Sequence, residues 1–322
     1  MDMRPLADTG LVSSRLVLGT MTFGSQVDQE TATAMVERSM AAGINHFDTA
    51  NAYNLGVSES MLGRALGSRR DEVLVATKVF NPMGDGPDDR GLSPAAVRKA
   101  IDASLRRLGT DYVDLYYLHQ PDYTVPLEET LGAMADLVAA GKVRHVAGSN
   151  YAAWQLCQMA NLSAVRGMPP VRVSQLMYNL ISRGVEDEYV AFSQDLGLST
   201  IVYNPLAGGL LTGKHQPKAA VAEGSRFTKA EYRSRYWSAP QFSAVDQLRA
   251  VAERAGWSLV ELSLRWLLAR PPVDAVLIGA SGIAQLEANI AAADGPTPDQ
   301  ETMAACDEVW QELRGPVPHY NR

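Results

Sequence analysis

The alternation of short apolar runs with amphipathic stretches constrains the fold of this chain most. Apolar residues recur at helical spacing in the intervening stretches, as at Val97, Ile101 and Leu105, after a Ser93-Pro94 start that suits a helix N-terminus. Eight runs rich in apolar or β-branched residues are typical of buried strands. These runs are residues 16–18, 43–48, 73–79, 113–119, 143–149, 173–178, 198–203 and 275–278. Eight successive strand–helix units predict an α/β fold, a (β/α)8 TIM barrel.

The number of domains depends on whether these units form one barrel or two smaller sheets. A chain of 322 residues with 46% hydrophobic content could build either. No linker rich in Pro, Gly or Ser separates the units, so we expect one domain over residues 1–322. The competing fold, a doubly wound dinucleotide-binding sheet, requires GxGxxG directly after an early strand, and no such match occurs.

Charge and composition argue against several classes of partner. The net charge of -7 disfavours a nucleic-acid or acidic membrane surface, which needs an excess of Lys and Arg on one face. No apolar run approaches the ~18 residues of a membrane-spanning helix, and the start MDMRPLADTG lacks the apolar core of a signal peptide. Cys157 and Cys306 lack ligand spacing and are expected to be free, buried thiols. We therefore expect a cytoplasmic protein.

A metal site is not expected. His46 shares a strand face with Asp48, but no second imidazole or carboxylate stands at ligand spacing from it. We expect His46 to be a hydrogen-bonded core histidine.

Three loops are longer than ordinary connections. They cover residues 80–92, 120–126 and 207–242, and each follows a predicted strand. All three are expected at the C-terminal face, where barrel enzymes hold their sites. The third contains Tyr232, Tyr236 and Trp237 among basic residues. It could be a lid over the site or a surface loop with its own apolar cluster.

Polar residues end four consecutive predicted strands. Asp48, Lys78, His119 and the pair Ser149-Asn150 stand at these ends, which should converge at the mouth of a barrel. Burying an ionised Asp or Lys costs on the order of several kcal/mol unless it is paired. We therefore expect Asp48 and Lys78 to form a buried pair, either as a simple salt bridge or as part of a catalytic site.

Tyr53 and His119 favour the catalytic interpretation. An ammonium beside a phenol favours the phenolate and lowers its pKa from the reference value of ~10. Lys78 could act on Tyr53 in this way while Asp48 holds Lys78 in place. An imidazole at the neighbouring strand end can orient or polarise a substrate oxygen.

The motifs GINHFDTANAYN, VLVATK and VDLYYLH together resemble those of the aldo-keto reductase family. The family's catalytic tetrad of Asp, Tyr, Lys and His maps onto Asp48, Tyr53, Lys78 and His119. The resemblance runs from TGLVSSRLVLGTMTFG to IGASGIAQLEANI and so covers nearly the whole chain. It implies hydride transfer from NAD(P)H to an aldehyde or ketone, with Tyr53 as the acid, Lys78 tuning it, and His119 fixing the carbonyl.

The resemblance also implies that the cofactor binds at the barrel mouth without a Rossmann domain. The cofactor contacts it implies fall into four groups along the chain. They are Thr20, Met21, Gln26 and Asp48; Ser149, Asn150, Gln175 and Tyr203, at the nicotinamide; Asn204, Pro205, Leu206, Gly208 and Lys214, at the pyrophosphate, with Arg226 in the phosphate region; and Gly279, Ser281, Gln285 and Asn289, at the adenosine.

The choice between NADP and NAD depends on few cations. The Lys and Arg that some family members direct at the 2'-phosphate are replaced here by Gly279 and Gln285, and Ala288 stands where glutamate is common. The expectation of NADPH, with NAD less favoured, rests on Lys214 and Arg226. Residues 208–214 also match GxxxxGK, but His215 follows instead of Ser or Thr, so we do not expect a P-loop.

Two classes of function fit this resemblance. One is an NADPH-dependent reductase of a small-molecule aldehyde or ketone, keto-sugars included, which could also oxidise the alcohol. The other is a cofactor-sensing subunit with slow turnover, similar to the voltage-gated potassium channel beta subunits. The tetrad is compatible with both, and a barrel that begins almost at Met1, without a long effector segment, favours the enzyme.

Overall fold

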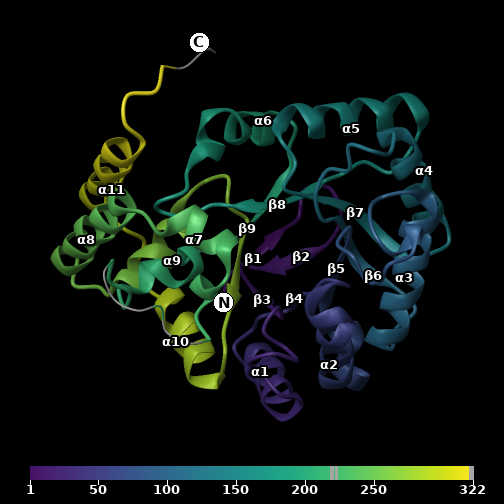
Figure 1. Ribbon diagram of the computed structural model, residues 1–322, viewed down its shortest axis with the longest axis horizontal. Helices are drawn as coiled ribbons and strands as arrows, with labels where there is room; N and C mark the ends of the chain where they lie inside the picture. The colour runs from purple at the N-terminus through teal and green to yellow at the C-terminus, as the bar shows by residue number, and fades with distance from the viewer. Residues whose placement is uncertain (218–220, 222–223, 319–322) are drawn as a thin grey trace.

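Eight parallel strands close into a barrel in a computed structural model that describes residues 1–217, 221 and 224–318. The order around the barrel is β10-β3-β4-β5-β6-β7-β8-β9, which confirms the predicted (β/α)8 fold (Figure 1). The barrel strands are β3 (Leu16–Gly19), β4 (His46–Asp48), β5 (Leu74–Val79), β6 (Val113–Leu118), β7 (Val143–Ser149), β8 (Val173–Met177), β9 (Ser199–Tyr203) and β10 (Ala275–Gly279).

Helices surround the barrel on its outer side (Figure 1). Those that follow the barrel strands are α1 (Gln29–Ala41), α2 (Val57–Leu66), α3 (Pro94–Leu108), α4 (Leu127–Ala139), α5 (Ala153–Arg166), α6 (Tyr189–Asp195), α9 (Leu259–Ala269) and α10 (Ile283–Ala293). Helix α3 begins as the sequence predicts, because Ser93 accepts from the Ala96 N–H and Pro94 opens the first turn. Its buried face carries Val97, Ile101 and Leu105.

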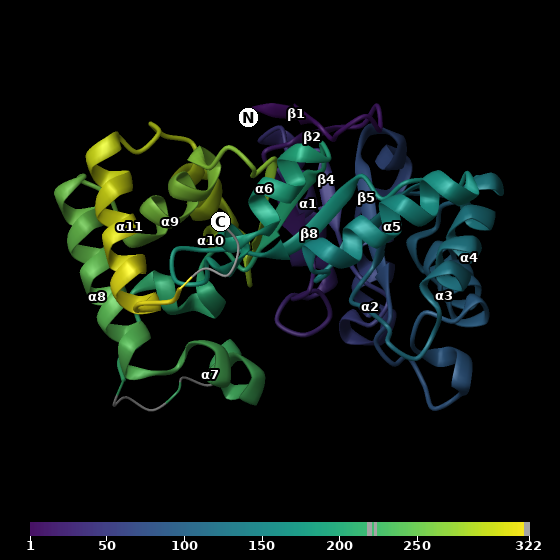
Figure 2. The same cartoon turned by 90° about the horizontal axis from the view of Figure 1, so that it is seen from above.

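Further elements extend beyond the barrel. A hairpin of β1 (Met3–Pro5) and β2 (Val12–Ser14) lies at one end of the barrel, and α7 (Ala230–Tyr236) lies toward the other (Figure 2). Helices α8 (Ala239–Arg254) and α11 (Gln300–Arg314) pack against each other outside the ring. Within the described part of the chain, no helix is long and apolar enough to span a bilayer.

The barrel interior is apolar below its C-terminal mouth. Small and branched side chains fill it, because each strand turns alternate residues inward. The buried interior cluster includes Val17, Leu74, Ala76, Leu115, Tyr117, Ala147, Val173, Ile201 and Ala275. Strand β4 is shorter than predicted, since Gly43 adopts a left-handed turn (φ 83°) and the strand starts at His46. His46 is fully buried and its Nδ1 lies 2.9 Å from Ser13 Oγ, which confirms a hydrogen-bonded core histidine.

The third long loop has the apolar cluster of its own that was one of the two interpretations considered for it. Phe227, Tyr232 and Tyr236 are buried, and Trp237 packs edge-on against Phe227 with ring centroids 4.8 Å apart. The same loop also lines the large cavity described below. Residues 218–220 and 222–223 of the predicted loop lie outside the described residues.

The two cysteines differ in their surroundings. Both thiols are free in the described structure, and Cys306 is buried as expected. The expectation that Cys157 is buried is wrong, because it lies on an exposed face of α5. Helical spacing alone did not identify the face of α5 that packs on the barrel.

We predict that Asp114→Ala lowers the free energy of unfolding by about 3 kcal/mol. Asp114 is 1% exposed and accepts hydrogen bonds from Arg70 at 2.8 Å, Arg144 at 3.0 Å and the Val75 N–H at 2.9 Å. Its removal leaves the buried Arg70 guanidinium without its carboxylate. Urea denaturation followed by circular dichroism measures the change.

The matched control is Asp136→Ala, which removes a carboxylate paired with Arg98 on the surface. Because the side chains of Arg98 and Asp136 are both about half exposed or more, we expect the free energy of unfolding to change by no more than about 1 kcal/mol. Equal losses in the two variants would contradict the structural role assigned to Asp114.

Candidate active site

Four polar side chains meet at the C-terminal mouth of the barrel. Asp48 is the last residue of β4, Lys78 lies near the end of β5, and His119 directly follows β6. Lys78 Nζ donates to Asp48 Oδ1 and, at 2.8 Å, to the Thr49 carbonyl. It also lies 5.1 Å from the ring centroid of Tyr53, and the Tyr53 ring meets His119 edge-on at 6.0 Å. The structure thus brings together the four residues that the sequence motifs indicated.

The turn that carries Tyr53 has an unusual backbone. Tyr53 begins a 3-10 turn after β4, and Asn54 (φ 49°) and Leu55 (φ 52°) adopt left-handed conformations within it. Such conformations cost free energy in residues other than glycine. Asn54 holds the turn in place, because its side-chain Nδ2 donates to the carbonyls of Phe23 at 2.6 Å and Met21 at 3.2 Å. Strain concentrated here fits a functional segment.

A buried carboxylate behind this turn was not identified from the sequence. Glu59 of α2 is fully buried and accepts hydrogen bonds from Thr77 Oγ1 and Arg107 Nε, each at 2.6 Å. Thr77 immediately precedes Lys78, so Glu59 joins the helix after Tyr53 to the strand that carries Lys78. The available signal was an acidic residue shortly before the apolar residues Met61 and Leu62.

Asp48 has a partner for each of its carboxylate oxygens. Lys78 pairs with Oδ1, and Gln175 of β8 donates from Nε2 to Oδ2 at 2.9 Å. Burial is the largest single influence and lowers the pKa of Lys78, but Asp48 and Tyr53 together outweigh it and the pKa is raised. Lys78 is therefore an ammonium at neutral pH.

Lys78 lowers the pKa of Tyr53, as the sequence predicts, but it does not set the net direction of the shift. Burial is the largest influence and raises the pKa of Tyr53, while the Lys78 ammonium offsets only part of that rise. Tyr53 consequently retains its proton at neutral pH. For His119, burial first and then the Lys78 charge lower the pKa to about 3, so the imidazole is neutral.

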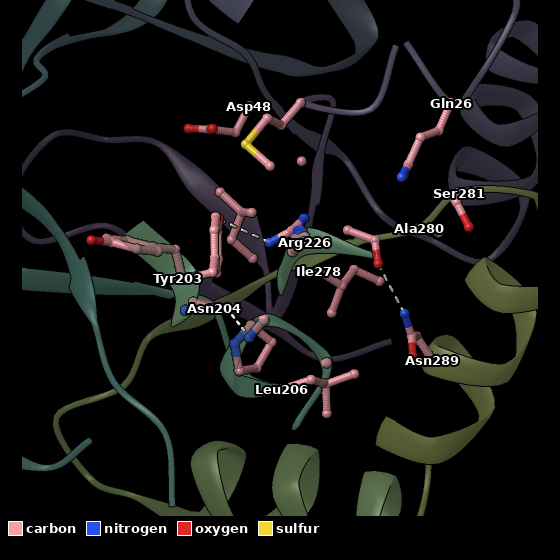
Figure 3. A pocket seen from close by; sticks show the side chains of 18 of the residues that line it. Gln26, Asp48, Tyr203, Asn204, Leu206, Arg226, Ile278, Ala280, Ser281 and Asn289 are labelled. Atoms are coloured by element: carbon pink, nitrogen blue, oxygen red, sulfur yellow. Dashed lines mark hydrogen bonds between the residues drawn. The ribbon is translucent and has the colours of Figure 1, made fainter. Parts of the chain in front are cut away.

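A cavity of about 620 Å³ extends from these residues across the mouth of the barrel. In Figure 3, Asp48 and Tyr203 lie toward one side of it, Ser281 and Asn289 toward the other, and Arg226 between them in this view. Most of the sequence-predicted contacts line it. They are Met21, Gln26, Asp48, Ser149, Asn150, Gln175, Tyr203, Asn204, Pro205, Leu206, Gly208, Lys214, Arg226, Gly279, Ser281, Gln285 and Asn289.

Thr20 and Lys78 are not among the described residues that line the cavity. Lys78 is 1% exposed and contacts Asp48 and Tyr53 from behind the cavity wall. Thr20 is fully buried, and its hydroxyl bonds to the Asp48 carbonyl at 3.1 Å and to Ser58 Oγ at 2.8 Å. Thr20 therefore joins β4 to α2 instead of facing the cavity.

Comparison with known sequences agrees with this geometry. The sequence model of the Aldo/keto reductase family matches residues 15–311. The chain belongs to this family. Aldo/keto reductases generally use a nicotinamide cofactor, and the oxidoreductases among the relatives support an oxidoreductase activity.

Several relatives are similar over nearly their full length. Uncharacterized oxidoreductase YrpG of Bacillus subtilis (strain 168) is 33% identical, with 97% of each chain covered. Aflatoxin B1 aldehyde reductase member 2 of Rattus norvegicus is 36% identical over 95% of this chain and 87% of that protein. A probable voltage-gated potassium channel subunit beta of Oryza sativa subsp. japonica is 35% identical over 91% and 92%.

At the end of the cavity beside the tetrad, polar side chains hydrogen-bond to one another. Tyr203 donates its hydroxyl to Asn150 Oδ1 at 2.7 Å, and Asn150 Nδ2 donates to the His119 carbonyl at 2.9 Å. Asn150 (φ 62°) and Asn204 (φ 61°) adopt left-handed conformations at the ends of their strands. This arrangement fixes the Tyr203 ring beside the tetrad.

The other end of the cavity offers neutral donors and a helix N-terminus. Asn289 Nδ2 donates to the Gly279 carbonyl at 3.3 Å (Figure 3), and the 11-residue helix α10 starts after Gly282. The first N–H groups of a helix favour an anion. Arg226 approaches Gly279 so closely that a Cβ there would lie 3.2 Å from Arg226 Nη2. These residues fit the phosphates and adenosine of a dinucleotide.

The third loop reaches across this cavity. Gln26 Nε2, from the loop after β3, donates to the Gly224 carbonyl at 2.7 Å. Arg226 Nη1 lies 3.4 Å from the Tyr232 hydroxyl, and Tyr232 packs against Gly208, where a Cβ would lie 2.8 Å from its ring. The loop after β3 and the third loop are thus joined across the cavity by the Gln26–Gly224 bond.

Proposed function

We propose that this aldo/keto reductase reduces an aldehyde or ketone to an alcohol with NADPH. The observation that carries the proposal is the Lys78–Asp48 pair beside Tyr53 and His119 at one end of the cavity. The nicotinamide, when bound, supplies the hydride. Tyr53 then donates its proton to the carbonyl oxygen, as a general acid within hydrogen-bond reach.

Each of the other three residues has a role that follows from its charge. Lys78, held as an ammonium by Asp48, stabilises the phenolate that Tyr53 becomes after it donates. His119 is neutral and carries one N–H, which can donate to the carbonyl oxygen and orient it. The raised pKa of Tyr53 keeps the transferable proton in place at neutral pH.

Turnover with a panel of aldehydes, ketones and keto-sugars tests this proposal. The loss of NADPH absorbance is measured for the wild-type protein and for Tyr53→Phe. Turnover that depends on Tyr53 supports the reductase. The alternative, a cofactor-sensing subunit, is supported by the similarity to the rice channel subunit. Tight NADPH binding without turnover of any carbonyl above the Tyr53→Phe control would contradict the reductase and favour the sensor.

We predict that Arg226→Ala weakens NADPH binding about tenfold or more and changes NADH binding much less. A guanidinium forms charge-assisted hydrogen bonds to phosphate, and Arg226 is the cation that approaches the adenosine end at Gly279. Isothermal titration calorimetry with each cofactor measures the two dissociation constants.

Arg233→Ala is the matched control, because Arg233 lies exposed on α7 of the same loop. It should leave both affinities unchanged. If Arg226→Ala weakened both cofactors equally, Arg226 would bind the shared pyrophosphate and the assignment to NADPH would lose its support.

We also predict a flat pH profile of kcat/KM for reduction between about pH 5 and 8 at saturating cofactor. His119, with a pKa of about 3, stays neutral throughout this range. Burial raises the pKa of Tyr53 above its usual value, so the acid form persists throughout this range. A change in kcat/KM with a midpoint near pH 6.5 would contradict the neutral state of His119.

A further inference from the structure

The loop after β5 places an amide against the catalytic imidazole. Asn81 Nδ2 lies 3.3 Å from His119 Nδ1, and both residues line the large cavity together with Tyr53. Asn81 also lines a smaller cavity of about 60 Å³ on the α3 side of this loop. Its amide therefore stands in the wall between the two cavities, behind the imidazole.

The backbone of His119 is fixed by other contacts. Its N–H donates to the Val79 carbonyl at 3.0 Å, and its carbonyl accepts from Asn150 Nδ2 at 2.9 Å. These bonds position the residue but do not determine which ring nitrogen carries the proton. Among the residues that the structure describes, the ring has one hydrogen-bond partner, which is Asn81.

A neutral imidazole has one N–H donor and one acceptor nitrogen. When the Asn81 amide donates to Nδ1, that nitrogen is the acceptor and the proton must be on Nε2. Nε2 is the remaining ring nitrogen and is left free for a ligand. A partner on one nitrogen commonly sets the tautomer in this way.

We propose that Asn81 is a positioning residue that sets the tautomer of His119, so that Nε2–H is available to the carbonyl oxygen of the substrate. The inference rests on the proposed function for the role of His119, but the tautomer itself is a property of the resting protein. The charged group nearest the imidazole is Lys78, and the Tyr53 ring faces it at 6.0 Å.

Asn81→Asp is the sharpest test, because a carboxylate has nearly the same shape but can only accept. It would accept from Nδ1–H and so place the proton of the neutral imidazole on Nδ1, while the same carboxylate raises the pKa of His119. We expect kcat to fall about 100-fold where the imidazole is neutral, because Nε2 then lacks its proton, and a new ionisation to enter the pH profile where the imidazolium forms. Asn81→Leu, which keeps the volume but offers no donor, should give mixed tautomers and an intermediate loss.

The direct readout is nitrogen-15 NMR of histidine-labelled protein without substrate, with His119→Phe to assign the signal. We expect the wild-type proton on Nε2 and a protonated Nδ1 in Asn81→Asp. Asn161→Asp is the control, since it adds the same charge on the exposed face of α5 and should change neither tautomer nor kcat.

A proton on Nδ1 in the wild-type protein would overturn the inference, as would an unchanged tautomer and kcat in Asn81→Asp. If His119→Phe lost activity while Asn81→Asp remained normal, only the role of Asn81 would fail. If the wild-type protein reduced no carbonyl, the proposed function would fail, and the NMR spectrum would still decide the tautomer.

Discussion

Replacing Tyr53 by phenylalanine is expected to lower kcat for carbonyl reduction about 10³-fold. The substitution removes only the hydroxyl, so no residue remains to donate the proton at that point of the cavity. The ring keeps its edge-on contact with His119 and its place beside the Lys78 ammonium. We therefore expect cofactor affinity and stability to stay close to those of the wild type. Steady-state kinetics and calorimetric titration with NADPH measure these quantities.

Tyr112→Phe is the control for this substitution. Tyr112 donates its hydroxyl to the Asp71 carboxylate at 2.8 Å and packs between Arg70 and Arg144 outside the cavity. Its loss should leave kcat unchanged. A Tyr53→Phe variant as active as Tyr112→Phe would exclude Tyr53 as the acid.

Replacing Lys78 by methionine is expected to abolish reduction, with a loss of at least about 10³-fold in kcat. Methionine fills a similar volume but cannot stabilise the phenolate of Tyr53. The variant also leaves Asp48 buried and without its cation, which costs about 3–5 kcal/mol of stability. Cofactor binding should be largely retained, because Lys78 does not line the described part of the cavity.

A double variant separates the catalytic effect from the structural one. Lys78→Met combined with Asp48→Asn removes both buried charges and should recover much of the lost stability. Reduction should remain absent, since Tyr53 still lacks the ammonium. Recovery of activity together with stability would show that Lys78 acts only through the fold. Denaturation midpoints and kcat, measured on the same preparations, decide between the two.

Most of the fold followed from local patterns. Strand and helix periodicity alternate in the sequence, and polar residues at strand ends predicted the meeting of Asp48, Lys78 and His119. Their convergence is a consequence of barrel topology, because all parallel strands end at the same face. The start of β4 was predicted three residues early, since Gly43 suits a turn as well as a strand.

The properties that escaped prediction depend on three-dimensional surroundings. The pKa of Tyr53 results from burial opposed by the Lys78 charge, and only the structure shows that burial is the larger effect. The contact between Asn81 and His119 joins residues 38 positions apart and has no local sequence signal. For Glu59, the bond to Thr77 likewise required the packing of α2 on β5.

In the proposed reduction, Tyr53 donates a proton to the carbonyl oxygen, and the hydride on the carbonyl carbon comes from the cofactor. The most direct test uses NADPH deuterated at the transferred position, with mass spectrometry of the alcohol product. We predict one deuterium on the carbinol carbon with the wild-type protein and almost none with Tyr53→Phe over the same time. Product without deuterium, or equal labelled product from both proteins, would contradict the account.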